Sequence, residues 1–414
     1  MGVSGVVLLI LLCAFPFGPA LQNIAMTLAV ILCIRSFVHR RSRPAWPAPG
    51  PLRWAALSML GFLVWNVISS LLNPANASEP IAYFIGFSPI LILPWLAGSL
   101  PSPSLPTLQR LEKIGAIVVV IWGVACLSQT LWPWRWVGSM PVAGGIPRAQ
   151  GFYSHPLTLA YSALLIWPFA VLRLFQKPRA WTSWAYGVGT ALMLIYSMSR
   201  TVQALAAALV LWNVFYLFSG RRRWQILGIM ALLGLVLALT KNPVSIRFRH
   251  LIHGTEENYH FSDYPDDRLA FWHAHAVMIQ ERPVLGHGVH ISLDYRQPYY
   301  ERIGLGDFKK KYPAHNQYIQ MLAEGGLIAL GFFLAWLFFS FRVLKDPSVP
   351  AFLKTLGPQT LWIFILGGLT QNAFYDSDVR MGLVILSTIV ALYAGRSGTG
   401  RRAGGVDDLR TVVQ

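Results

Sequence analysis

The chain has 414 residues, of which 55% are hydrophobic and only 12% are charged. A soluble protein this apolar could not cover its surface with polar groups, so the composition excludes an ordinary soluble enzyme and indicates a membrane protein. The net charge of +17 does not indicate nucleic-acid binding, because its distribution along the chain has a different explanation, given below.

The apolar residues come in blocks of roughly 16–22, close to the ~20 that a helix needs to cross about 30 Å of hydrocarbon. We therefore predict an all-α polytopic membrane protein with about twelve transmembrane helices. The predicted spans are 3–17, 20–37, 53–72, 82–99, 114–132, 155–175, 184–199, 201–218, 225–240, 317–341, 355–374 and 380–395.

Lysine and arginine residues divide unequally between the two sides of this topology. If both termini are cytoplasmic, the inner segments hold 20 of them, and the short outer loops hold four: Arg135, Arg148, Arg200 and Arg380. Cytoplasmic loops carry an excess of Lys and Arg, so this bias predicts that both termini are cytoplasmic. The other ten lie in one long outer segment, and long translocated loops are largely exempt from the rule.

The same map divides the chain into four regions. They are 1–240 with the first nine transmembrane helices, 241–314 as a loop domain on the outer face, 315–395 with three further transmembrane helices, and 396–414 as a cytoplasmic tail. The loop is polar and rich in histidine and acidic residues. We expect it to be folded and mostly helical.

One helix can be predicted inside this loop. Asp266 and Asp267 are suited to cap its start, and it is expected to reach about Ile279. Its apolar side is predicted to consist of Leu269, Trp272, Ala276 and Val277. Pro283 and Gly286 are expected to stop it.

A His-Asn pair stands where the polar loop becomes the apolar helix that begins near 317. Histidine has a near-neutral pKa, so His315 is suited to take a proton from a hydroxyl group. Asn316 is suited to orient the histidine or to bind a sugar hydroxyl. The competing interpretation is that His315 is a cap or core residue.

The outer arginines are candidates for binding an anionic group. Guanidinium groups match phosphate oxygens bidentately, and they can stabilise the charge that grows on a leaving diphosphate. Arg200 either serves this purpose or extends to lipid headgroups, and Arg268 either serves it or pairs with the neighbouring Asp266 or Asp267. Arg148 fits both readings equally. Asp378, with Asp376, is a candidate partner of these arginines or of the substrate.

The remaining loop histidines suggest a zinc site, which we do not favour. His273 and His275 would diverge on a helix, and His287 and His290 have no accompanying zinc motif. There is also no glycine-rich phosphate loop, so we expect neither a metal nor a nucleotide cofactor.

These motifs resemble the O-antigen ligase and polymerase superfamily. The segment HNQYIQMLAEGGLIAL (315–330) is similar to its His-Asn signature, RPVLGHG (282–288) to its Pro-x-x-Gly-x-Gly element, and SMSRT (197–201) to its Ser-Arg helix end. The first 130 residues agree only in hydropathy, and Ala329 stands where members often have Gly. The resemblance implies a C-type glycosyltransferase fold that works without metal.

The resemblance also implies roles and partners. Arg200 and Arg268 would hold the diphosphate of an undecaprenyl-diphosphate-linked glycan donor, and His315 would act on the acceptor hydroxyl of lipid A-core. The expected setting is the periplasmic face of a Gram-negative inner membrane, among membrane lipids and without nucleic acid. We favour ligation with inversion at C1 over three alternatives. The single large outer loop argues against polymerisation, and the short tail argues against protein O-glycosylation. The polar candidates cluster at the outer edge of the membrane, which argues against transport.

Overall fold

The computed structural model describes residues 1–39, 50–73, 80–132, 142–143, 146–240, 242–245, 267–306 and 312–394. The described residues form helices apart from one two-residue antiparallel ladder, β1 (Val142–Ala143) with β2 (Ile146–Pro147). The helices of the first part are α1 (Val3–Ala14), α2 (Pro19–His39), α3 (Pro51–Leu71), α4 (Pro80–Phe87), α5 (Pro89–Gly98) and α6 (Leu105–Leu131). The all-α prediction is confirmed.

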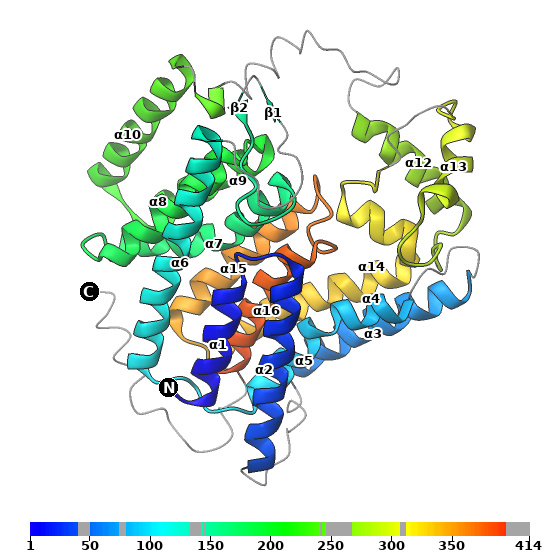
Figure 1. Cartoon of the computed structure of the whole chain (residues 1–414), viewed down its shortest axis with the longest axis horizontal. Coiled ribbons are helices and arrows are strands. Elements are labelled where there is room, and N and C mark those ends of the chain that lie inside the picture. The colour runs from blue at the N-terminus through cyan, green and yellow to red at the C-terminus, as the bar shows by residue number, and fades with distance from the viewer. Residues whose placement is uncertain are drawn as a thin grey trace.

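After the ladder, the described part of the chain is again helical (Figure 1). Four helices follow, α7 (Pro156–Gln176), α8 (Trp181–Tyr196), α9 (Arg200–Leu217) and α10 (Gly220–Leu239). Beyond them lie α12 (Asp267–Glu281), α13 (Leu293–Arg302), α14 (Gln317–Val343), α15 (Ala351–Gly367) and α16 (Ser377–Ala391).

Every predicted span coincides with a helical segment in the described part of the chain. Eight segments are long and apolar enough to cross a membrane: α2, α3, the α4–α5 pair, α6, α7, α9, α10 and α14. The helices α1, α8, α15 and α16 are shorter, with 12, 16, 17 and 15 residues. The chain is therefore a multi-pass membrane protein, and the twelve-span topology stays a prediction.

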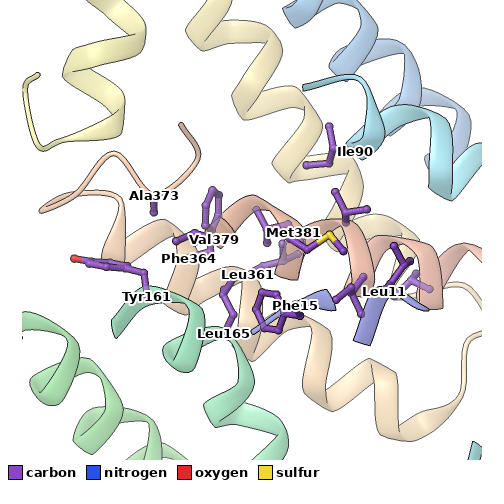
Figure 2. Close-up of a cluster of buried hydrophobic side chains, with 14 of the residues drawn as sticks. Leu11, Phe15, Ile90, Tyr161, Leu165, Leu361, Phe364, Ala373, Val379 and Met381 are labelled. Atoms are coloured by element: carbon purple, nitrogen blue, oxygen red, sulfur yellow. The ribbon is translucent and has the colours of Figure 1, made fainter. Parts of the chain in front are cut away.

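Apolar side chains from distant helices form the largest core cluster among the described residues, and two smaller clusters lie around α12 and α13. Figure 2 shows Leu11 and Phe15 at α1, Leu165 from α7, Phe364 from α15 and Met381 from α16 in the largest cluster. Small residues let helices approach closely in membranes. A Cβ atom on Gly123 of α6 would lie 2.7 Å from the Gly189 carbonyl oxygen of α8, so here the two backbones touch.

Helix α14 is broken near its start. Gly326 has φ 66° and ψ −167°, a conformation that is essentially restricted to glycine. The loop after α12 packs into the break. Its Gly288 N–H donates to the Glu324 carbonyl (2.8 Å), and the Leu327 N–H donates to the Pro283 carbonyl (2.9 Å). The break therefore joins the loop region firmly to a membrane helix.

The predicted loop helix is present as α12, and it ends before Pro283 as expected. Its predicted apolar side was wrong. Ala270, Phe271, Ala274 and Met278 are the buried positions, whereas Leu269 is 38% exposed and Trp272, Ala276 and Val277 are only partly buried. The reason is that α12 packs against both α13 and α14, beside which it lies in Figure 1. Asp266 lies outside the described residues.

Candidate functional site

His315 occupies a fixed and unusual backbone position just before α14. Its φ of 49° is uncommon for a residue other than glycine, and such strain persists only where the surroundings enforce it. Both backbone groups of the preceding Ala314 are held. The Ala314 N–H donates to Gln320 Oε1 (3.0 Å), and its carbonyl accepts from Trp272 Nε1 (2.8 Å). Helices α12 and α14 therefore fix His315 together.

The His315 ring is held by a residue that the sequence analysis did not single out. Its Nδ1 lies 2.8 Å from Oε1 of Gln371, in the turn that follows α15. The rings of Phe271 and Tyr312 lie 5.8 and 6.2 Å from it, measured between centroids. The signal for Gln371 was present, because QNAFYDSD is a polar run at the end of an apolar span.

Asn316 caps α14. Its side-chain oxygen accepts hydrogen bonds from the backbone N–H groups of Tyr318 (3.0 Å) and Ile319 (3.2 Å). Asn316 is also buried. The oxygen is thus committed to the helix end, as expected for a residue at this position.

His155 brings a second imidazole to the neighbourhood of His315. It caps α7, and its Nδ1 accepts from the Leu157 N–H (3.1 Å). Desolvation and the positive charge of Arg148 lower the pKa of His155, the Asp376 carboxylate opposes this, and His315 adds a smaller lowering. His155 is therefore within electrostatic range of Arg148, Asp376 and His315.

Arg148 is tied to the turn that leads into α9. Its guanidinium donates from Nε (3.1 Å) and Nη2 (3.0 Å) to the Ser197 carbonyl. The Ala149 N–H donates to the Tyr196 carbonyl (2.9 Å), which extends the connection. Arg200 is the first residue of α9, three residues after Ser197, and its side chain has no hydrogen-bond or ion-pair partner among the described residues. It is half-buried.

Arg268 lies in the first turn of α12. Its charge acts on the hydroxyl of Tyr161, and this hydroxyl is hydrogen-bonded to Thr370 Oγ1 (2.9 Å). Thr370 directly precedes Gln371. Arg268 is therefore within electrostatic range of Tyr161, whose hydrogen-bond partner Thr370 is next to the residue that contacts His315.

Asp376 and Asp378 begin α16. One oxygen of Asp376 accepts from Thr158 Oγ1 (2.6 Å), and the other caps the helix by accepting from the Asp378 N–H (3.0 Å). Asp378 is only 5% exposed, and its Oδ1 is buried without a hydrogen-bond partner. Neither carboxylate forms an ion pair with an arginine among the described residues, so the expected pairing is not found.

The loop histidines are engaged by the fold itself. His275 Nδ1 contacts the Phe271 carbonyl (2.7 Å), and burial lowers the pKa of His275 to about 4. His287 lies between the Tyr295 hydroxyl (2.9 Å) and the Met278 carbonyl (2.7 Å). Within the described ranges, no three His, Cys, Asp or Glu side chains are grouped in a way that could hold a metal ion.

The helices define a multi-pass membrane protein. The ionisable residues described above form a candidate site at the ends of α7, α9, α14, α15 and α16. Residues 185–334 match the family described as O-antigen ligase, a stretch that contains Arg200, Arg268 and His315. This part of the chain is therefore similar to the O-antigen ligase family, in agreement with the motifs in the sequence. No curated protein matches the chain.

Proposed function

We propose that this protein is an O-antigen ligase. In this reaction, a polysaccharide moves from undecaprenyl diphosphate to a sugar hydroxyl of lipid A-core. The single observation that carries the proposal is that His315 contacts Gln371 while the charge of Arg268 reaches Tyr161, the partner of the adjacent Thr370, and that both residues lie in the segment that matches the family. A base with a cation nearby is what the transfer of a glycan from a diphosphate requires.

The proposed mechanism is a single displacement. The acceptor oxygen attacks C1 of the donor sugar while His315 takes the hydroxyl proton. The bond from C1 to the diphosphate oxygen breaks, and the diphosphate leaves with the electron pair. Arg200 and Arg268 stabilise the negative charge that develops there. Attack opposite the leaving group predicts inversion at C1.

The proposed setting follows from the charge bias of the loops. With both termini in the cytoplasm, the 241–314 segment and the site lie on the periplasmic side of the inner membrane. No nucleotide is available there, so the energy for transfer has to arrive in the donor. A lipid-linked sugar diphosphate meets this requirement, because its C1–oxygen bond is already activated. Asn316, Arg148 and Asp378 remain proposed substrate contacts.

The test is complementation in a Gram-negative strain that lacks its own ligase. The chain should restore long polysaccharide ladders on lipopolysaccharide gels, and His315→Ala and Arg268→Ala should not, although both variants reach the membrane. Polymerisation is the alternative that the family match leaves open. Lipopolysaccharide with a single repeat, accumulating when this gene is deleted from its own host, would favour the polymerase.

A further inference from the structure

The hydrogen bond to Gln371 defines which nitrogen of His315 carries the proton. The Nδ1 atom lies 2.8 Å from Gln371 Oε1, and an amide oxygen can only accept a hydrogen bond. The hydrogen between the two atoms must therefore belong to Nδ1. A neutral imidazole has one N–H group, so the lone pair of His315 is on Nε2.

The turn that carries Gln371 is anchored on two sides. The Gln317 N–H at the start of α14 donates to the Gly368 carbonyl (2.8 Å). A Cβ atom on Gly368 would collide with the Gln317 side chain, so the turn packs directly on the residue two positions after His315. On its other side, Thr370 is hydrogen-bonded to Tyr161 of α7. These contacts fix the position of Gln371 relative to His315.

We propose that Gln371 is a positioning residue of this enzyme: by accepting the Nδ1–H of His315, it keeps the Nε2 lone pair available for the proton of the acceptor hydroxyl. The inference rests on the proposed function. In the step itself, the O–H bond breaks, its proton moves to Nε2, and the oxygen electron pair forms the new bond to C1. The bond from C1 to the diphosphate breaks in the same step. The Gln371 oxygen then faces the positive charge of the imidazolium.

The second histidine of the site supports this assignment by contrast. The Nδ1 of His155 accepts a hydrogen bond from the Leu157 N–H, so neutral His155 carries its proton on Nε2. The lone pair on Nδ1 of His155 accepts the hydrogen bond that caps α7. Neutral His155 therefore has only an N–H group left to donate, whereas the tautomer of His315 leaves a lone pair that can accept a proton.

The first experiment measures kcat/KM against pH in proteoliposomes that contain a lipid-linked glycan and lipid A-core. Gln371→Met keeps the length of the side chain but removes the acceptor, and Gln371→Glu keeps an acceptor and adds charge. A matched control is Gln359→Met on α15, where the amide pairs with Asn213 (2.9 and 3.2 Å) far along the helix from His315. Each variant is first compared with the wild type by a thermal melt.

Gln371→Met should lower kcat/KM about 10–100-fold, less than the ~10²–10⁴-fold contribution of a general base, because the histidine remains but its tautomer is no longer held. Gln371→Glu should retain most of the activity. Its carboxylate favours the imidazolium, so the acid limb of the pH profile should move to higher pH by about one unit. Gln359→Met should leave kcat/KM and the pH profile unchanged, even if it melts earlier.

The second experiment reads the tautomer directly, by ¹⁵N NMR of histidine-labelled protein with His315→Gln for assignment. The wild type should carry the proton on Nδ1, and Gln371→Met should show a mixture. Protonation of wild-type His315 on Nε2 would overturn the inference, as would an unchanged kcat/KM and pH profile in Gln371→Met. Absence of turnover in the wild type is a separate result, which counts against the proposed function and does not affect the NMR reading.

Discussion

The break in α14 gives a strong prediction about stability. Gly326→Ala adds one methyl group where the backbone has φ 66° and ψ −167°. The added Cβ would collide with the Val284 carbonyl oxygen of the loop that inserts into the break. Because this atom belongs to the backbone, no side-chain rotation can relieve the contact. The loop and α14 must separate, or the helix must change its path.

The size of the effect can be worked out from the local structure. Placing alanine in this glycine-only region costs about 1–3 kcal/mol. Separating the loop from α14 also breaks the three backbone hydrogen bonds His287 N–H to Ala323 O (2.9 Å), Gly288 N–H to Glu324 O (2.8 Å) and Leu327 N–H to Pro283 O (2.9 Å). Each contributes a net ~1 kcal/mol. We therefore expect Gly326→Ala to destabilise the protein by about 4–6 kcal/mol.

The assay is reversible unfolding of the purified protein in mixed micelles with increasing denaturing detergent. The matched control is Gly331→Ala on the same helix, where an added Cβ meets no atom within 4 Å. Alanine has the higher helix propensity, so this control should be neutral or more stable by up to about 1 kcal/mol. If Gly326→Ala and the control unfold at the same detergent concentration, the loop insertion does not stabilise the fold in the way described.

Three further predictions concern the site and its surroundings. Arg200→Lys and Arg268→Lys should each lower the ligation rate about 10–100-fold, because a lysine cannot bind phosphate oxygens bidentately. A variant that ligates at the wild-type rate would remove the substituted arginine from the mechanism. Trp272→Phe loses the hydrogen bond to the Ala314 carbonyl, so it should destabilise the protein by about 1 kcal/mol and slow the reaction, as checked by detergent unfolding and initial rates. Burial lowers the pKa of His275 to about 4, so the unfolded chain binds a proton between pH 6.5 and 4 that the folded chain does not. Stability should therefore fall by up to about 3 kcal/mol as the pH drops through this range, and His275→Leu should remove this part of the loss; an equal acid sensitivity in both proteins would contradict the assignment.

Much of the site was visible in the sequence because it depends on local chemistry. His315 and Asn316 stand at a boundary between polar loop and apolar helix, and Asn316 caps the helix as such residues do. Gln371 was missed because its role depends on a partner 56 positions away. The apolar side of α12 was misjudged for a related reason. A helix that packs against two neighbours buries more than one stripe, and its sequence does not say which neighbours it has.

The sequence by itself determined that this is an all-helical membrane protein and where its apolar segments run, because each span must satisfy its own backbone hydrogen bonds and its own hydrophobic length. Only the tertiary structure decided how those segments meet. The break at Gly326, the insertion of the 283–288 loop and the contact between Gln371 and His315 all join residues that are distant in the chain. Lipid-facing and protein-facing sides of such helices are both apolar, so hydropathy cannot distinguish them, and packing supplies what the pattern leaves undetermined.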